Sequence, residues 1–417
     1  MPHRRAHPAH LSRPISRPLP QLSRRSCLRL LLAAPAAAAL SACGGGDPSP
    51  VAQALDAEST AAVADGLVAL ALGHVGPAGG TVSVAGRRRQ GQSAPATATD
   101  HFPVGSCTKA MTCATVLALA AQGGPSVDTP LSEAFASWAG DLDPALAPVT
   151  LGDLLHHRGA LPGFYGEGDA EAALWDAVQG AQDPLPTTLL GRRQWFSHWL
   201  LSQPPVAGLT PGVDYRYSNA GYIVVAAALE ALTGESFEAL FQRLLLQPLG
   251  LTGAWRSFVP SGDEPLWGHE GPAGQLVEVV ATEDSLAAQP WLDLLGPAGL
   301  WSCTAAAHAR WLHWHLKALT GQNTPLPPAY VAGLRAATGT EDYTWGWVPL
   351  ATPHRLMLTH DGQTPGFQAE TVLDRGGDFA AFALSNTADR AADRSSWVGA
   401  RMDQAVLGTL NRLGVVL

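Results

Sequence analysis

The sequence predicts an α/β (α+β) fold in which one antiparallel sheet is built from the N- and C-terminal segments and is flanked by helices. Residues 81–85 alternate like a strand near the start of the chain. After residue 342, short β-rich segments are separated by Gly or Asp turns. Residues 125–290 instead have helical patterns and long Pro- and Gly-rich loops. This arrangement predicts a mainly helical subdomain inserted into a sheet domain.

Local signals predict the individual elements. Residues 52–72 are rich in Ala and Leu, which favour a helix. Periodic apolar positions predict further helices at residues 106–122, 220–233, 304–319 and 397–413. Alternation predicts C-terminal strands at residues 343–349, 355–359, 366–373 and 379–385.

The first 42 residues have the composition of an export signal. Residues 1–29 contain seven arginines and no acidic residue, and a short apolar Leu/Ala segment follows. Residues 23–28, Ser-Arg-Arg-Ser-Cys-Leu, are similar to a twin-arginine signal. Residues 40–43, Leu-Ser-Ala-Cys, are similar to a lipobox, which predicts cleavage before Cys43 and a lipid on its thiol. A plain signal peptide with a chance Cys is the alternative.

Three segments follow from this reading. Residues 1–42 are the predicted signal, residues 43–56 a flexible tether, and residues 57–417 the main folded domain. Composition also limits the class of protein to which the mature chain can belong and the partners that it can bind. The chain is 46% hydrophobic and 15% charged, which is typical of a globular protein with a sizeable core. Without the signal, 19 basic residues face 35 acidic ones, a net charge of −16. That charge argues against nucleic acid as a partner. The predicted location is the cell envelope or periplasm, with the protein lipid-anchored to a membrane.

The strongest chemical signal is Ser106-Cys107-Thr108-Lys109 at the start of a predicted helix. Residues three apart share a helix face, so the Lys109 amine can reach the Ser106 hydroxyl. Serine becomes a nucleophile when a base takes its proton, and a desolvated lysine can be that base. The chain has 24 arginines and only two lysines, Lys109 and Lys317. Because lysine, unlike arginine, can be neutral at ordinary pH, this scarcity strengthens the assignment of Lys109 as the base.

Two later segments carry further candidates. Tyr217 and Asn219 lie directly before a predicted helix. Tyr217 could relay a proton as phenol or phenolate, and Asn219 could donate its amide to a substrate carbonyl or to Lys109. His360-Asp361-Gly362 is predicted as a strand end that runs into a Gly turn, where backbone N–H groups can approach a ligand closely.

In this order, Ser-x-x-Lys, Tyr-x-Asn and His-x-Gly resemble the serine β-lactamase and penicillin-binding-protein superfamily. The similarity is to its branch of class C β-lactamases, D-Ala-D-Ala carboxypeptidases, D-aminopeptidases and esterases. Flanking segments agree with this branch over about residues 57–415. They are residues 102–105 (Phe-Pro-Val-Gly), 154–164 (Leu-Leu-His-His-Arg-Gly-Ala-Leu-Pro-Gly-Phe), 247–251 (Gln-Pro-Leu-Gly-Leu) and 297–302 (Pro-Ala-Gly-Leu-Trp-Ser).

The resemblance implies the β-lactamase/transpeptidase fold and a role for each matched residue. Ser106 would form the acyl-enzyme, while Lys109 and Tyr217 would share base and acid duty. The backbone N–H groups of Ser106 and Gln363, next to Gly362, would form the oxyanion hole. Asn219 would support Lys109 and the substrate amide. His360 would help to bind a carboxylate or to polarise Tyr217.

Histidine at position 360 replaces the lysine of efficient class C β-lactamases, so the expected activity is that of a related esterase or peptidase. The alternatives are a D,D-carboxypeptidase or weak β-lactamase, and a non-catalytic receptor for penicillin or cell-wall peptide. The expected substrate is a small ester, amide or peptidoglycan-type peptide. No cofactor is expected. His156-His157 is not predicted to bind a metal, because no carboxylate or Cys lies at ligand spacing.

Overall fold

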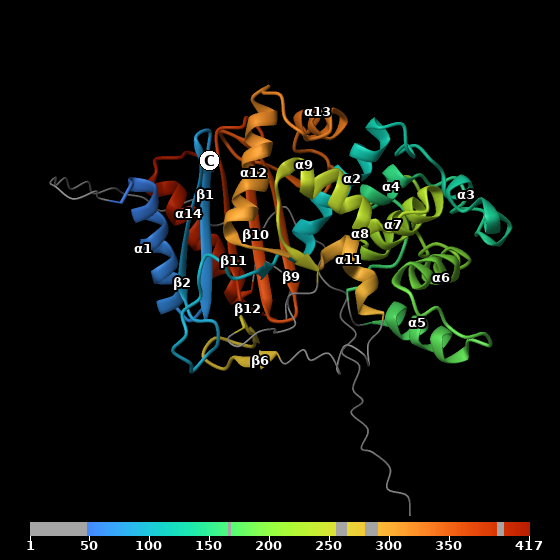
Figure 1. The fold of residues 1–417 in the computed structure, drawn as a ribbon, viewed down its shortest axis with the longest axis horizontal. Helices are drawn as coiled ribbons and strands as arrows, with labels where there is room; N and C mark the ends of the chain where they lie inside the picture. The colour runs from blue at the N-terminus through green and yellow to red at the C-terminus, as the bar shows by residue number, and fades with distance from the viewer. Residues whose placement is uncertain (1–47, 166–167, 256–264, 280–290, 390–395) are drawn as a thin grey trace, which may run out of the picture.

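The computed structural model describes residues 48–165, 168–255, 265–279, 291–389 and 396–417 (Figure 1). A six-stranded antiparallel sheet lies on one side of the molecule and a cluster of helices on the other. The strand order is β2-β1-β11-β10-β9-β8. The strands are β1 (Ala69–Gly76), β2 (Gly79–Gly86), β8 (Val348–Ala351), β9 (Leu356–Thr364), β10 (Phe367–Asp374) and β11 (Ala380–Ser385). Because β1 pairs with β11, the two ends of the chain form one sheet, which confirms the predicted fold class.

Alternating side chains give this sheet two buried faces. Leu70 and Leu72 of β1 pack under α1 (Pro50–Ala64) and α14 (Trp397–Arg412). Ala69 and Ala71 point to the opposite face, which α12 (Ala305–Leu319) covers. Successive strand side chains point to opposite faces, so one strand supplies both cores. Helices α1 and α14 therefore cover one face of the sheet, and α12 covers the other (Figure 1).

The helical part lies beyond α12 and contains most of the chain between the two sets of strands (Figure 1). Its centre is α2 (Thr108–Ala121), which is buried on nearly all sides and therefore has apolar or small residues around its whole circumference. The other described helices there are α3 (Leu131–Ala134), α4 (Leu151–Leu155), α5 (Asp169–Gly180), α6 (Leu189–Leu201), α7 (Asn219–Thr233), α8 (Phe237–Phe241), α9 (Gln247–Leu249) and α11 (Gly296–Gly299). Helix α13 (Pro328–Ala336) packs against α12.

Single-turn helices and two small sheets complete the described chain. The helical turns are η1 (Gly105–Cys107), η2 (Ala136–Asp141), η3 (Gln242–Leu246) and η4 (Leu292–Leu295). One small sheet has the order β3-β7-β4, and the other β12-β5-β6. Their strands are β3 (Phe102–Pro103), β4 (Ala254–Trp255), β5 (Gly268–Glu270), β6 (Val277–Val279), β7 (Trp301–Cys303) and β12 (Thr387–Ala388).

Two boundary predictions near the N-terminus are wrong. Helix α1 begins at Pro50, so residues 50–56 are helical and not part of a flexible tether. Ser49 caps the helix, and Pro50 occupies its first position, where a missing N–H costs nothing. The helix ends at Ala64 and not at residue 72, because Gly66 takes a φ of 115° and the chain turns into β1. The predicted signal and Cys43 lie outside the described residues.

The strand predicted at residues 343–349 is largely a turn. Within this segment, pairing with β9 begins only at Val348, the first residue of β8. Trp345 has a φ of 41° and Gly346 a φ of 90°, so the chain cannot continue there as an extended strand. A Cβ on Gly346 would lie 2.2 Å from the Cα of Ala110, so this turn packs directly on helix α2.

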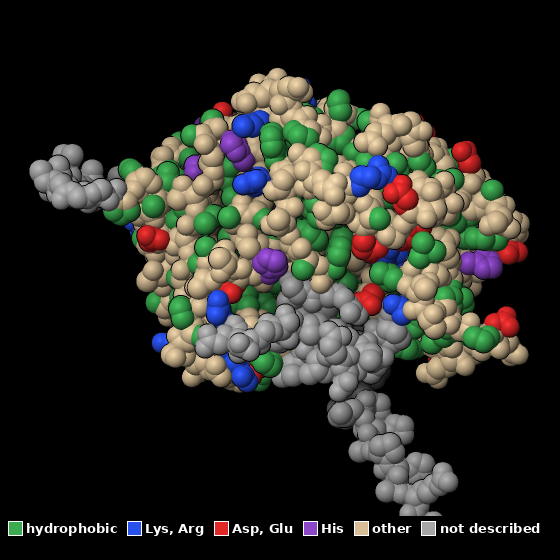
Figure 2. All heavy atoms as spheres, in the orientation of Figure 1, with side chains coloured by type: hydrophobic (Ala, Val, Ile, Leu, Met, Phe, Trp, Pro, Cys, Tyr) green, Lys and Arg blue, Asp and Glu red, His purple; other side chains and the backbone are tan. Residues whose placement is uncertain are grey.

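The surface in Figure 2 carries basic and acidic side chains interspersed with each other. None of the helices in the described ranges is both long enough and apolar enough to span a bilayer.

A buried ion cluster joins three helices of the helical part. Arg193 of α6 is fully buried, and its guanidinium contacts Glu230 of α7 at 2.6 Å and also Glu238 of α8. Glu230 accepts a second hydrogen bond from the N–H of Phe237 (3.0 Å). A buried charge is tolerated only when it is paired and hydrogen-bonded, so the cluster fixes how these helices pack.

Replacing Arg193 with Met should therefore lower the free energy of unfolding by about 3–5 kcal/mol, since it leaves Glu230 buried without its counter-charge. Arg401→Met is the matched control, because Arg401 pairs with Asp65 at the surface and should change stability by less than about 1 kcal/mol. Urea denaturation followed by circular dichroism measures both. Equal stability of the two variants would contradict the role of the cluster.

Candidate active site

Ser106 lies in the turn that leads into α2. Strand β3 pairs with β7, and the Val104 N–H donates to the Trp301 carbonyl (3.0 Å), so the chain enters the turn from a fixed position. Gly105 then takes a φ of 51°, which glycine adopts without strain. The Thr108 hydroxyl donates to the Gly105 carbonyl (2.7 Å) and closes the turn. Ser106 is thereby held at the N-terminus of a buried helix.

Lys109 lies one helical turn later and is fully buried. Its Nζ is 3.0 Å from Ser106 Oγ, 2.7 Å from Asn219 Oδ1 and 2.6 Å from the Ala298 carbonyl oxygen. Burial lowers the pKa of Lys109 well below its ordinary value of 10.5. The amine is therefore held in a setting that favours its neutral form.

The three partners determine how a neutral amine is oriented. The Ala298 carbonyl and Asn219 Oδ1 can only accept hydrogen bonds, so they take the two N–H groups. The remaining partner is the Ser106 hydroxyl, which can donate. In the neutral form of Lys109, the nitrogen lone pair would face the Ser106 hydroxyl, which lies 3.0 Å away.

Tyr217 completes this group from the other side. Its ring centroid lies 4.8 Å from Lys109 Nζ, and its hydroxyl is near enough to Ser106 for that side chain to lower its pKa. Burial raises the pKa of Tyr217 well above its ordinary value, and the Ser106 contact opposes this only in part. The raised pKa favours the phenol form of Tyr217 over the phenolate, the other form that the sequence allows.

Asn219 is placed by the start of α7. Ser218 caps that helix, and the Asn219 N–H donates to the Gly163 carbonyl (2.8 Å). Asn219 Nδ2 donates to the Phe164 carbonyl (2.7 Å), which leaves Oδ1 as the acceptor for Lys109. The sequence suggests that the Asn219 amide donates to Lys109. In the structure Lys109 Nζ is the donor and Asn219 Oδ1 the acceptor.

The turn around Ser106 lies against β9. Strand β8 pairs with β9 only up to Thr359, so His360–Thr364 extends beyond it. A Cβ on Gly362 would lie 2.0 Å from the Val104 carbonyl oxygen and 2.9 Å from the Ser106 nitrogen. A Cβ on Gly105 would likewise lie 2.3 Å from the Gln363 nitrogen. The backbone nitrogens of Ser106 and Gln363 are therefore brought together by a contact that only glycines allow.

His360 and its neighbours differ from the prediction in secondary structure. They lie within β9, which continues to Thr364, so the predicted strand end is wrong. His360 is also buried, with Nε2 2.8 Å from the Tyr343 hydroxyl and Nδ1 2.6 Å from the Asp361 carbonyl. Its ring centroid is 6.3 Å from that of Tyr217. The Gln363 side chain donates to the Asp389 carbonyl, so only its backbone is directed at the Ser106 turn.

The structure thus brings Ser106, Lys109, Tyr217 and Asn219 together, with Gly362 and Gln363 beside them. Sequence reasoning missed Ala298, whose carbonyl binds Lys109, and Tyr343, which binds His360. A backbone carbonyl leaves no sequence signal of its own. In the sequence, residues 297–302 show only a resemblance to a family segment, which does not indicate a contact with Lys109.

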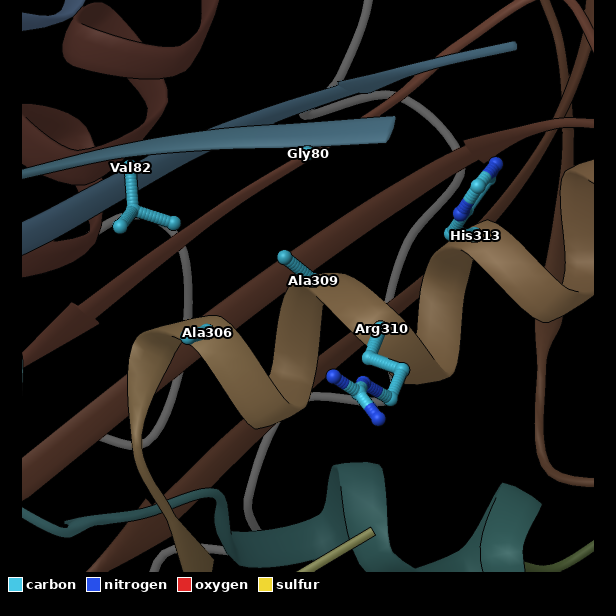
Figure 3. Close-up of a pocket in the computed structure, with 6 residues that line it drawn as sticks. All are labelled: Gly80, Val82, Ala306, Ala309, Arg310 and His313. Carbon is cyan, nitrogen blue, oxygen red and sulfur yellow. The ribbon is translucent and has the colours of Figure 1, made fainter. Parts of the chain in front are cut away.

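A shallow hollow between β2 and α12 lies apart from these residues (Figure 3). Its polar side chains, His313 and Arg310, contact the Pro77 and Gly250 carbonyls, and its other lining residues are Gly, Ala and Val. It holds no nucleophile. Within the described ranges, no three His, Cys, Asp or Glu side chains are arranged to hold a metal ion.

The chain is similar in sequence to known proteins. The sequence model of the family described as Beta-lactamase matches residues 45–405. The unguisins hydrolase ungD of Aspergillus violaceofuscus (strain CBS 115571) is 25% identical over 269 residues, which cover 58% of this chain and 43% of that protein. The chain therefore matches less than half the length of this relative.

Solved structures share the fold. D-amino acid amidase from Ochrobactrum anthropi SV3, complexed with L-phenylalanine amide, has a TM-score of 0.64 at 18% identity, covering 87% of this chain and 99% of that one. EstCE1, a hydrolase with promiscuous acyltransferase activity, has a TM-score of 0.63 at 19% identity, covering 87% and 98%.

The contact between Gly362 and the Ser106 turn gives a direct test. Gly362→Ala should lower kcat for a short-chain nitrophenyl ester by about 10²-fold, because its Cβ forces β9 away from Ser106. Gly140→Ala is the control, since a Cβ there meets no atom within 4 Å. A Gly362→Ala variant with the kcat of the control would show that this contact does not set the site geometry.

Proposed function

This chain belongs to the beta-lactamase family, and we propose that it is a serine hydrolase that cleaves an ester or amide bond through an acyl-enzyme on Ser106. The observation that carries the proposal is the buried Lys109 amine, which lies 3.0 Å from Ser106 Oγ and is held in place by Asn219 Oδ1 and the Ala298 carbonyl. A pure binding protein does not need a base oriented in this way.

The proposed reaction uses each group in turn. Ser106 Oγ attacks the substrate carbonyl carbon while its proton passes to Lys109 Nζ. The backbone N–H groups of Ser106 and Gln363 stabilise the oxyanion that forms. Tyr217 gives its proton to the leaving alcohol or amine and recovers it from the Lys109 ammonium. Water then attacks the acyl-enzyme by the reverse sequence, which releases the acid and restores Ser106.

Relatives support the class of substrate. Two of them are an amidase that was solved with an amino acid amide and a hydrolase with acyltransferase activity. We propose an ester or a peptide-like amide as the substrate class. D,D-carboxypeptidase or weak β-lactamase activity is the alternative, and a short panel of substrates separates them. Export and lipid attachment at Cys43 remain predictions from the first 43 residues.

Ser106→Ala should abolish turnover of a nitrophenyl ester, a D-amino acid amide and a chromogenic cephalosporin, whichever of them the wild type hydrolyses. Mass spectrometry should detect an acyl adduct on wild-type Ser106 during turnover. Serine-independent turnover, or a wild type that binds these compounds without hydrolysing any of them, would refute the proposal.

Lys109→Arg should lower kcat by at least about 10³-fold, because a guanidinium stays protonated and cannot act as the base. Lys317→Arg is the matched control. Lys317 is the only other lysine of the chain and lies over the Trp314 ring, a contact that arginine can keep. Both variants should keep the circular dichroism spectrum of the wild type. Full activity of Lys109→Arg would exclude the amine as the base.

The pH dependence should report the same amine. The protonated form of Lys109 cannot accept the serine proton, so kcat/KM rises with pH as the amine loses its proton. Since burial lowers this pKa, the rise should be complete well below the ordinary lysine value of 10.5. Initial rates of ester hydrolysis, corrected for the enzyme-free reaction, measure the profile. A midpoint near 10.5 would contradict a buried neutral base.

A further inference from the structure

His157 has no role in the proposed reaction, yet it occupies the space behind Tyr217. It is 1% exposed and follows α4, which ends at Leu155. Its φ is 60°, in the left-handed region that non-glycine residues seldom adopt. Such backbone conformations persist only where surrounding contacts hold them, and they concentrate at functional sites. Its ring also packs against Tyr222 and Tyr343, and three of the contacts that hold it lie at or beside Tyr217.

Three contacts from His157 bracket the tyrosine. Its carbonyl accepts the N–H of Arg216 (2.8 Å), directly before Tyr217. Its Nδ1 accepts the N–H of Ser218 (3.1 Å), directly after it. Its ring lies against the Tyr217 ring, with centroids 4.2 Å apart and planes inclined by 36°. One residue thus holds the backbone on both sides of Tyr217 and packs on its side chain.

The hydrogen bond to Ser218 also fixes the tautomer of the imidazole. Because Nδ1 accepts an N–H, it carries no proton, and a neutral ring must carry its proton on Nε2. Burial lowers the pKa of His157 well below its ordinary value, which favours the neutral ring. Nε2 is buried and has no hydrogen-bond partner within the described part of the chain.

Tyr165 binds the backbone carbonyl of Tyr217 itself. Its hydroxyl donates to the Tyr217 carbonyl (2.7 Å), and its ring stacks on the Tyr217 ring at 6.3 Å. This side chain is 49% exposed, whereas His157 is buried behind Tyr217. Tyr217 is therefore clamped from an outer and an inner side, and the inner clamp needs an acceptor at the position of His157 Nδ1.

We propose that His157 is a positioning residue that sets the Tyr217 phenol against Ser106 and Lys109 through its Nδ1 hydrogen bond and its ring contact. This rests on the proposed hydrolase function, in which Tyr217 transfers protons. The competing explanation is an ordinary core histidine, whose loss would reduce stability without a specific effect on proton transfer.

The chain offers a matched control for that explanation. His269 is fully buried, and its Nε2 accepts the N–H of Gln90 at 3.1 Å, the same distance as the His157 contact with Ser218. It lies on β5, outside the group around Ser106. His269→Ala thus removes an N–H acceptor at the same distance, together with the Nδ1 hydrogen bond to the Asn386 carbonyl (3.0 Å), and neither contact involves Tyr217.

Replacing His157 with Ala should lower kcat for a nitrophenyl ester by about 10²-fold and change KM by less than about threefold, because substrate still binds while Tyr217 is misplaced. Alanine is a fair replacement, since Ala160 already adopts a φ of 51° in this chain. His269→Ala should lower the melting temperature comparably but keep the wild-type kcat. A kcat loss shared by both variants, or absent from His157→Ala, would overturn the proposal.

Two conservative variants keep the test decisive if His157→Ala does not fold. Asparagine tolerates the left-handed region and places an oxygen near the position of Nδ1, whereas glutamine places its oxygen near that of Nε2. His157→Asn should therefore retain kcat within about tenfold of wild type, while His157→Gln should lose about 10²-fold. Equal kcat values for the Asn and Gln variants would contradict the acceptor role of Nδ1.

A double-mutant cycle shows whether the effect passes through Tyr217. In a Tyr217→Phe background, the His157 variant should cost less than about threefold in kcat, because the hydroxyl that it positions is gone. Full additivity would refute the inference. Ser106→Ala, assayed alongside, separates the two hypotheses: turnover that survives it refutes the hydrolase mechanism itself. A wild-type kcat in the His157 variant, with an inactive Ser106→Ala, refutes only the positioning role.

Discussion

The site depends on keeping one amine out of water. Lys109 is fully buried, and each of its hydrogen-bond partners comes from a different element: Ser106 from η1, Asn219 from α7 and Ala298 from α11. An ammonium ion at this position would pay a large desolvation cost with no carboxylate among these three partners, so the neutral amine is the stable form. The packing of three helical segments is thus what favours an unprotonated lysine that is available as a base.

The site around Lys109 is assembled from segments of the N-terminal and C-terminal parts of the chain. Strand β9 comes from the C-terminal part, and the Ser106 turn comes from the N-terminal part. They approach so closely that Gly105 and Gly362 leave no room for a Cβ between them. The sheet, in which β1 pairs with β11, fixes this approach over a long distance in sequence. The helical insertion then supplies Tyr217 and Asn219 from the opposite side. Neither part of the chain contains the site alone.

Much of this could be predicted from the sequence, because periodicity and spacing report local structure. The Ser106–Lys109 spacing predicted a shared helix face, and the scarcity of lysine identified the amine. The errors lie where tertiary contacts decide. A helix was predicted through residue 72, but the β1 pairing begins at Ala69. His360 was expected at a strand end, but pairing with β10 extends β9 to Thr364. Local residue preference cannot show which strand pairs with which.

One physical cause separates the roles of the two proton carriers. Burial penalises the charged form of any group, so it lowers the pKa of Lys109 and raises that of Tyr217. Both shifts favour the neutral forms, the amine without its extra proton and the phenol with its own, whereas in water at neutral pH both groups would be protonated. A pair of groups shifted in opposite directions is what acid–base chemistry at neutral pH needs. In the proposed reaction, the base and the acid are therefore prepared by the same dry surroundings. If water reached Lys109 and Tyr217 before substrate binds, it would reduce the pKa shifts of both groups at once.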